Sequence, residues 1–224
     1  MKTRIGLVHA TMNSVAPMVE AFKQHYPEVE LVHLMDEGLL LAVNEQGGIT
    51  SAILRRFEDL VEKAVDSNTD GVLLSCSVFT PYVPEIQKKH AIPVLSVDAA
   101  MLESALEMGE RIGVVATVAT AGPTTKGLLE QMAEERGKSV QVELEVVTEA
   151  FDALKSGDLD KHNQLIRDRA RKLAEKQVDV LVLAQISMAR AVPLVEELGK
   201  PVLTSPLTST SSIMNRIEEG RAKA

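Results

Sequence analysis

Short apolar runs alternate with helical patterns along the 224 residues of this chain. The runs are rich in Val, Leu and Ile without strict polar alternation, which is typical of strands buried on both faces of a parallel sheet. We therefore expect strands at residues 4–9, 29–34, 71–75, 93–96, 111–116, 140–147, 180–184 and 201–204.

Between these runs, apolar residues recur at helical spacing, most clearly over residues 53–65 and 159–174. Thr50 and Asp158 have the side chains of N-caps just before these segments. Gly109 and Gly199 follow the ends of predicted helices, where glycine often closes a helix. Alternating strands and helices predict right-handed βαβ units and an α/β fold.

The chain also contains an internal repeat. The segment TDGVLLSCSVFTPYVPEI at residues 69–86 resembles VDVLVLAQISMARAVPLV at residues 178–195, and RIGLV at 4–8 resembles RIGVV at 111–115. Further along, PVLS at 93–96 corresponds to PVLT at 201–204, in the same order. A repeat this long indicates duplication of a small domain rather than a solenoid.

The repeat predicts two pseudo-symmetric, flavodoxin- or Rossmann-like halves, each with a parallel sheet. The boundary is expected near residues 98–110, which gives an N-terminal half of residues 1–100 and a C-terminal half of residues 101–205. A C-terminal helix over residues 206–224 is expected to join the first half. The active site is expected in the cleft between the halves.

Ligands of open parallel sheets bind beyond the carboxyl ends of the strands. Turns rich in hydroxyl and amide side chains follow several predicted strands here: HATMNS at 9–14, SCSVFT at 75–80, ATVATAGPTT at 116–125 and AQISMA at 184–189. If the halves face each other, these turns converge on one cleft. The chain has no G-x-G-x-x-G, P-loop or zinc pattern, so it predicts no nucleotide or metal site.

Cys76 is the only cysteine, and Gln185 occupies its position in the second copy of the repeat. A thiol between a strand and a helix feels the helix N-terminus, which we expect to lower its pKa. The alternative is a buried small hydrophobe, since free cysteine is often simply part of a core.

Several other polar residues have two interpretations. Thr117 and Thr120 offer hydroxyl and N–H groups suited to a carboxylate, whereas helix capping explains Thr124 and Thr125 better. Asn13 and Ser14 fit binding or capping equally. His9 ends the first strand, where it reaches the cleft or is a satisfied core histidine. Three other histidines are interpreted most simply as surface or helix residues: His25, His90 and His162.

The composition of the chain limits the classes of molecule that we expect it to bind. Aromatic residues make up 3% of the chain, Trp is absent and the net charge is −8, all of which argue against nucleic acid. No apolar run approaches the roughly 20 residues of a membrane span. A basic signal-peptide region is absent and one cysteine cannot form an internal disulfide, so we expect a cytoplasmic protein.

These motifs resemble those of the aspartate/glutamate/hydantoin racemase superfamily, over nearly the whole chain. The resemblance is strongest in LLSCS around Cys76, in VLAQIS around Gln185, and in GVVATVAT at 113–120, which is similar to the family's substrate-carboxylate loop. The family's usual Cys-Asn-Thr is here Cys76-Ser77-Val78, and its second cysteine, usually followed by Thr, is here Gln185-Ile186.

In typical members two cysteines flank the substrate, one thiolate removing the α-proton and the other thiol donating a proton from the opposite face, without pyridoxal phosphate or metal. The resemblance implies a cofactor-independent isomerase that acts on a small carboxylate or dicarboxylate, and a homodimer. It makes Cys76 the base, acid or nucleophile, with Gln185 orienting the substrate. The implied substrate-binding residues are Thr11, Asn13, Ser77, Thr117, Thr120 and Ser187.

The glutamine leaves other functions open. A neutral amide has no proton-transfer pKa near 7, so Gln185 cannot replace a catalytic thiol, and a two-base racemase is the weaker mechanistic expectation. One thiol can protonate a carbanion after decarboxylation, as in the similar arylmalonate decarboxylases, which keep only the second-half cysteine. It can also add to a double bond, as in maleate isomerases. The alternatives from other classes are a non-catalytic carboxylate-binding protein and a periplasmic-binding-like or flavodoxin-like fold with a coincidental repeat.

Overall fold

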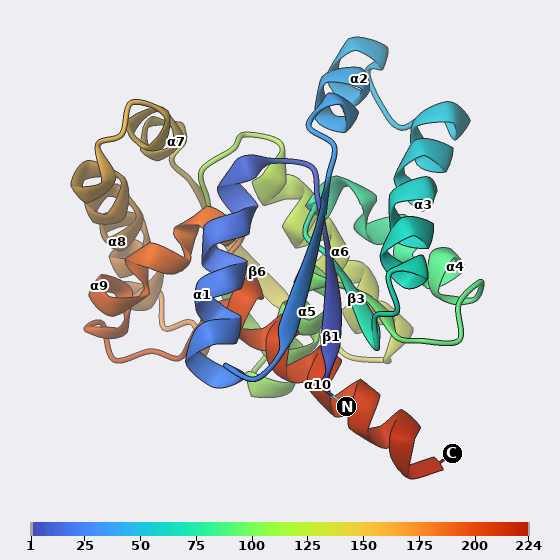
Figure 1. Cartoon of the computed structure of the whole chain (residues 1–224). Coiled ribbons are helices and arrows are strands. Elements are labelled where there is room, and N and C mark those ends of the chain that lie inside the picture. The colour runs from blue at the N-terminus through green and yellow to red at the C-terminus, as the bar shows by residue number, and fades with distance from the viewer. Residues whose placement is uncertain (1, 224) are drawn as a thin grey trace. The chain divides into compact units, whose positions relative to one another are not determined.

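The chain forms two compact units, each built on its own parallel sheet (Figure 1). The structure is a computed structural model that describes residues 2–223. Unit 1 contains the residues up to Ala99 together with those from Ser209 onward, and unit 2 is Ala100–Thr208. Both sheets have four strands flanked by helices, so the α/β fold class predicted from the sequence is confirmed.

In unit 1 the strand order is β2-β1-β3-β4 and every neighbouring pair is parallel. The strands are β1 (Arg4–His9), β2 (Glu30–Met35), β3 (Gly71–Leu74) and β4 (Val94–Ser96). Helices α1 (Val15–His25) and α3 (Ser51–Asp66) lie on opposite faces of this sheet (Figure 1). The shorter helices of the unit are η1 (Met12–Ser14), α2 (Gly38–Gln46), η2 (Ser77–Tyr82) and α4 (Val83–Gln87).

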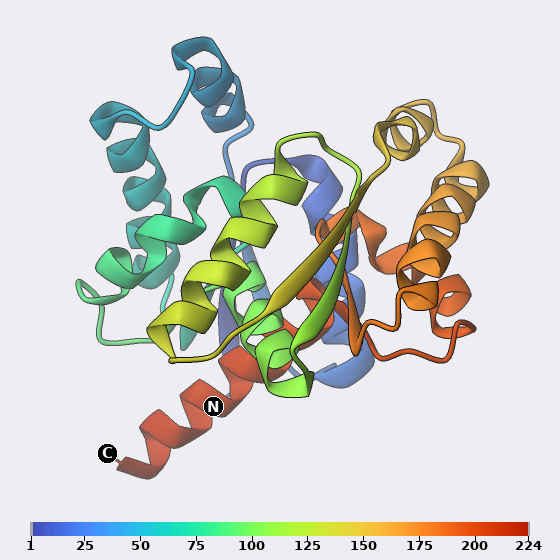
Figure 2. The same cartoon turned by 180° about the vertical axis from the view of Figure 1, so that it is seen from behind.

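Unit 2 repeats this topology with the order β6-β5-β7-β8. Its strands are β5 (Arg111–Ala116), β6 (Gln141–Val146), β7 (Val180–Leu183) and β8 (Val202–Thr204). Its helices are α6 (Ala121–Glu135), α7 (Thr148–Lys155), α8 (Leu159–Glu175), η3 (Ile186–Ala191) and α9 (Val192–Glu196). One core cluster lies between the sheet and α6 and a second between the sheet and α8, on opposite faces (Figure 2).

The sequence repeat corresponds to repeated hydrogen bonds. In unit 1 the Arg4 N–H donates to Asp70 Oδ2 over 2.8 Å, and in unit 2 the Arg111 N–H donates to Asp179 Oδ2 over the same distance. Each aspartate N–H returns a bond of 2.7 Å to the carbonyl of the same arginine. These pairs join the first strand of each unit to the turn before its third strand, so their role is structural.

The glycines of the repeated RIG motif are explained by close packing of a helix on the strand. A Cβ atom at Gly6 would lie 2.9 Å from the Cβ of Ala64, and one at Gly113 would lie 3.2 Å from the Cβ of Leu173. Real Cβ atoms rarely approach so closely, and interiors packed to this density do not absorb an added methyl group easily. Both units therefore need glycine at this strand position.

Two helices connect the units along the chain. They are α5 (Val97–Met108) and α10 (Ser205–Lys223). In unit 1, Arg221 of α10 donates to Asp70 Oδ1 over 2.8 Å and to Thr3 Oγ1 over 3.2 Å. No helix among residues 2–223 is both long enough and apolar enough to span a membrane.

Helix starts agree with the sequence at two positions. Thr50 Oγ1 accepts the N–H of Ile53 over 3.3 Å at the start of α3, and Asp158 Oδ1 accepts the N–H of Lys161 over 3.1 Å at the start of α8. Both predicted N-caps are therefore confirmed. Thr124 and Thr125 are not caps, which corrects our expectation, because α6 begins earlier, at Ala121.

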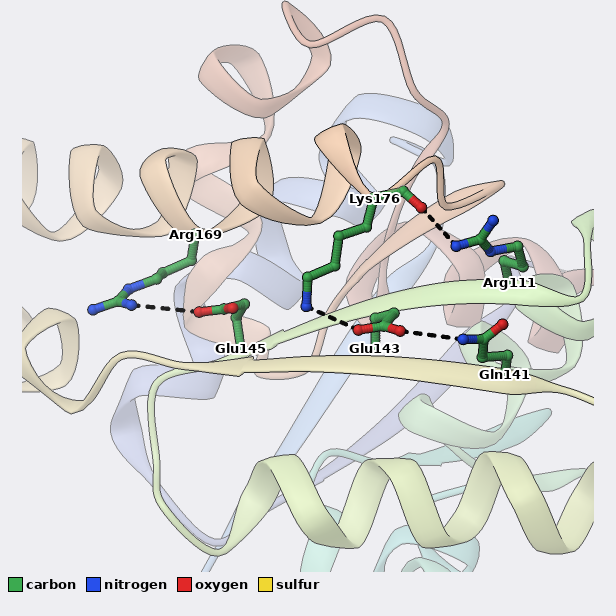
Figure 3. A network of polar contacts seen from close by, with 6 residues as sticks. All are labelled: Arg111, Gln141, Glu143, Glu145, Arg169 and Lys176. Carbon is green, nitrogen blue, oxygen red and sulfur yellow. Dashed lines mark hydrogen bonds and ion pairs between the residues drawn. The ribbon is translucent and has the colours of Figure 1, made fainter.

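The outer strand β6 of unit 2 has charged side chains opposite the C-terminal part of α8 (Figure 3). Lys176 Nζ lies 2.9 Å from Glu143 Oε2, and Arg169 Nη1 lies 3.4 Å from Glu145 Oε2. Ion pairs near the surface contribute little stability, about 0–1 kcal/mol each. Charged side chains on an edge strand do, however, discourage pairing with a strand of another molecule.

Candidate functional site

Cys76 follows β3 and is the N-cap residue of η2 in unit 1. Its side chain is buried, with 8% of the residue exposed. Three residues later, Phe79 stacks on Phe57 of α3, with ring centroids 4.0 Å apart and planes at 7°. Because Phe79 is fully buried, this stack fixes η2 on the core and holds the thiol on a rigid turn.

The thiol is not activated in the way we expected. Burial raises the pKa of Cys76 to about 12. The backbone N–H groups of Val78 and Phe79 lower the pKa only partly, and the charge of Asp98 raises it further. The expected lowering by a helix N-terminus is therefore wrong, since η2 is a short 3₁₀ helix whose amides do not offset the loss of hydration. At neutral pH the group is a thiol and thus a proton donor.

Asp98 is a buried carboxylate beside Cys76 that our sequence reasoning missed. Burial raises the pKa of Asp98 to about 6, while the hydroxyls of Ser77 and Thr80 pull it down to a smaller extent. Both carboxylate oxygens are buried and have no hydrogen-bond partner within bonding geometry, although the two hydroxyls are near enough to affect the pKa. The signal was present in the sequence, because Asp98 comes two residues after a predicted strand, in VLSVDA.

A second polar group of unit 1 surrounds His9, which is fully buried. His9 Nδ1 lies 2.8 Å from the hydroxyls of both Ser14 and Ser75, and Nε2 lies 3.1 Å from Nδ1 of His33. Both serine hydroxyls are also placed to donate to backbone carbonyls, an arrangement in which His9 Nδ1 carries the proton and donates to them. Burial, with His33, lowers the pKa of His9 to about 4. His9 is therefore a neutral, hydrogen-bonded core histidine.

In unit 2, Gln185 takes the position of Cys76, two residues after the end of β7 and at the N-cap of η3. Its Oε1 accepts the backbone N–H of Thr117 over 2.7 Å and the Thr117 hydroxyl over 3.0 Å. Because a backbone N–H can only donate, these bonds fix which end of the amide is the oxygen. Nε2 is buried and has no partner, so two N–H donors are available to an acceptor.

The other predicted residues of unit 2 differ in burial. Ser187 is buried, and its carbonyl accepts Arg190 Nε over 3.2 Å. Thr120 is exposed at the start of α6, and its side chain makes no capping hydrogen bond. His162 belongs to a helix, as we interpreted it, but it is fully buried, with Nδ1 2.7 Å from the carbonyl oxygen of Ala150.

The predicted residues of unit 1 are not all near one another. Ser77 is half-buried beside Cys76 and close enough to Asp98 to affect its pKa. Thr11 is half-buried and its carbonyl accepts the Ser14 hydroxyl over 2.8 Å. Asn13 is exposed within η1. The structure thus supports Ser77 as a neighbour of the thiol and gives Asn13 no such contact.

Two hollows of unit 1 lie away from the thiol. One of about 620 Å³ is at the amino ends of the strands, and its lining residues are Lys2, Arg4, Glu30, Asn68, Asp70 and Arg221. Two ion pairs lie within it, with Arg4 3.1 Å from Glu30 and Arg221 2.8 Å from Asp70. Ligands of parallel sheets bind at the opposite ends, where Cys76 lies. Among residues 2–223, no three His, Cys, Asp or Glu side chains gather to hold a metal ion.

Two α/β units of identical topology, one with a thiol and the other with an amide at the corresponding turn, define a duplicated α/β protein with polar groups at its strand ends. Residues 8–210 match the model of the Asp/Glu/Hydantoin racemase family. The chain belongs to this family. The resemblance stated from the sequence is thus confirmed at the level of the family.

Individual relatives are distant. A glutamate racemase of Trichodesmium erythraeum (strain IMS101) is 26% identical over 119 residues, 53% of this chain and 43% of that protein. The chain therefore matches less than half of that curated relative's length. An allantoin racemase from Klebsiella pneumoniae has a similar structure, with a TM-score of 0.74, 17% identity, and 97% and 89% of the two chains covered. An aspartate racemase homologue from Pyrococcus horikoshii OT3 is also similar, with a TM-score of 0.73 and 15% identity. The match covers 97% of this chain and 100% of that chain.

Proposed function

We propose that this protein is a cofactor-independent enzyme of the isomerase type that acts at the α-carbon of a small carboxylate or dicarboxylate through one thiol, Cys76. The observation that supports this most is the pair of corresponding turns in a racemase-family fold. One turn holds the thiol, and the other holds Gln185 with unpaired amide donors. Proton transfer and anion binding are thereby assigned to different residues.

Removal of an α-proton requires the thiolate of Cys76. The sulfur takes the proton, and the electron pair left on the α-carbon spreads into the neighbouring carboxylate. A proton returned by Cys76 restores the original stereochemistry, whereas a proton delivered by water to the opposite face inverts it. Fixed N–H donors stabilise the oxygen charge that builds up in this intermediate.

A decarboxylase of the arylmalonate type is the second candidate, and the protonation state of Cys76 favours it. The raised pKa means that the resting protein already holds the proton to be donated. Carbon dioxide would leave a malonate-like substrate, the electron pair would remain on the α-carbon, and the Cys76 S–H would protonate it. Water then reprotonates the sulfur.

Gln185 would bind a substrate oxygen through Nε2. Thr117 uses both its N–H and its hydroxyl to hold Oε1, so it orients the amide and has no further donor for a substrate. This refines the role expected for Thr117 from the resemblance. Thr11, Asn13, Ser77, Thr120 and Ser187 stay predictions as binding residues.

The test is hydrogen exchange in D₂O, followed by NMR, with aspartate, glutamate, hydantoins, maleate and substituted malonates. Deuterium at an α-carbon that is absent with Cys76→Ala supports proton transfer by the thiol. Chirality and carbon dioxide release then separate isomerase from decarboxylase. Val78→Ala, an exposed change on the same 3₁₀ helix, is the matched control and should keep full activity.

Full activity of Cys76→Ala would refute the proposal. Absence of turnover together with calorimetric binding of one of these acids would instead support a carboxylate-binding protein. Whether Cys76 and Gln185 act on the same substrate molecule is a prediction for the double variant. If they do, Cys76→Ala with Gln185→Leu should be no less active than Cys76→Ala alone.

A further inference from the structure

The first turn of α5, directly after β4, holds a buried acid that the proposed function does not use. We propose that Asp98 controls the proton of Cys76: the two side chains hold one negative charge between them, so the thiol ionises more readily when Asp98 is neutral. This inference rests on the proposed function, because control of the Cys76 proton matters only if Cys76 transfers that proton to or from a substrate. Asp98 acts only through the thiol and is in that sense a positioning residue.

Strand pairing places the two residues at the same end of the sheet. β3 and β4 are parallel neighbours in which Leu74 lies opposite Ser96. Cys76 and Asp98 each come two residues after that pair. The turns are also joined by hydroxyls, since Ser96 Oγ accepts the Asp98 N–H over 3.2 Å and lies 2.7 Å from Thr80 Oγ1 of η2.

The fold does not need a carboxylate at this position. In unit 2 the pairing of β7 with β8 repeats the same register, and the residue that corresponds to Asp98 is Pro206. The same strand-to-helix turn therefore forms without an acid. A buried carboxylate whose oxygens lack hydrogen bonds is costly, so its presence in unit 1 calls for an explanation other than folding.

Among the groups that face Asp98, Cys76 is the one that can ionise, and the others are neutral hydroxyls. From η2 these groups are the thiol and the hydroxyls of Ser77 and Thr80, and from β4 the hydroxyl of Ser96. The charge of Asp98 raises the pKa of Cys76, beyond the larger effect of burial. Two negative charges in this buried place are unfavourable, which is why one ionisation opposes the other.

The proton can be followed through either reaction. When the thiol protonates a carbanion, the S–H bond breaks and a C–H bond forms, and a neutral Asp98 then returns its proton to the sulfur and regains one from water. When the thiolate is needed as a base, the Asp98 carboxylate first takes the thiol proton. Neither route requires an oxidant, a reductant or a cofactor.

The test is the rate of Cys76 alkylation by iodoacetamide between pH 7 and 10, measured by mass spectrometry. Iodoacetamide is uncharged, so a change in protein charge does not alter its approach. Asp98→Asn should react about tenfold faster at each pH, which corresponds to a thiol pKa about one unit lower. Asp98→Glu keeps the charge and should stay slow. Asp59→Asn removes an exposed charge from α3 and should react like the wild type.

The inference is overturned if Asp98→Asn reacts no faster than the wild type. It is also overturned if Asp98→Glu is accelerated equally, because loosened packing would then be the cause. Alkylation needs no substrate, so its result is independent of the D₂O experiment. Unchanged exchange by Cys76→Ala would refute the proposed function, whereas unchanged alkylation of Asp98→Asn would refute only the control by Asp98.

Discussion

Replacing Asp98 by Asn should stabilise this protein at neutral and alkaline pH. Burial raises the pKa of this carboxyl from its ordinary value of 3.8 to about 6, so the folded state holds the proton more tightly than the unfolded state does. The stability that the neutral acid provides is complete below pH 3.8 and is lost as the pH rises through 6. Above pH 7 the folded protein contains a buried, unpaired negative charge.

The size of the effect follows from the shift. A change of about two pKa units corresponds to about 3 kcal/mol in the free energy of unfolding, and about half of it should develop between pH 5 and 8. Asn has nearly the shape of Asp but cannot ionise. We therefore expect Asp98→Asn and the wild type to differ little near pH 4, and the variant to be about 3 kcal/mol more stable at pH 8.

The assay is urea unfolding followed by circular dichroism at several pH values from 4.5 to 8, with Asp59→Asn as the charge-matched control. If the two units unfold in separate transitions, the effect belongs to the transition of unit 1, which contains Asp98. A difference that does not vary with pH would contradict the reasoning. So would a less stable Asp98→Asn at pH 8, since it would mean that the carboxylate is well satisfied in the folded protein.

Three further predictions concern other buried groups. The lowered pKa of His9 favours the neutral form in the folded state, so the wild type should lose stability as the pH falls from 6.5 toward 4. His9→Gln should remove this loss, which is measured as the midpoint of acid unfolding. Phe79→Ala deletes the ring stacked on Phe57 and should cost about 3–5 kcal/mol in urea unfolding, with Phe79→Leu costing less. Thr117→Val removes one of the two bonds to Gln185 and should cost about 1 kcal/mol, with a higher KM and little change in kcat on any substrate found.

The positions of the strands could be predicted from the sequence because buried parallel strands consist of short apolar runs. Each predicted strand agrees with the structure to within one residue at either end. The repeat added the topology, since two copies of one motif are expected to fold alike. The repeat extends to the backbone conformation of corresponding residues. Asn68 follows α3 and Gln177 follows α8, and both have a left-handed backbone, with φ of 54° and 58°.

The protonation states could not be predicted in this way. The sequence places Cys76 at a strand end but does not say how much water reaches it, and burial determines the direction of its pKa. The short helices α2 and α7 were not among our predicted elements, because eight or nine residues give a weak periodic signal. Asp98 was overlooked for a different reason. The candidate turns are those rich in hydroxyl and amide residues, whereas the segment after β4 begins with the apolar Val97 and continues as helix α5.

The two units share a scaffold but not a chemistry, and the contrast can be compared position by position. The residues that end or follow the corresponding strands are His9, Cys76 and Asp98 in unit 1 and Ala116, Gln185 and Pro206 in unit 2. Because both sets are compatible with the same strand order, register and arginine–aspartate bonds, folding does not explain the difference. At these positions unit 1 has all the titratable side chains and unit 2 has none. The strand ends of unit 1 therefore carry groups that can exchange a proton, whereas the corresponding residues of unit 2 offer only neutral groups.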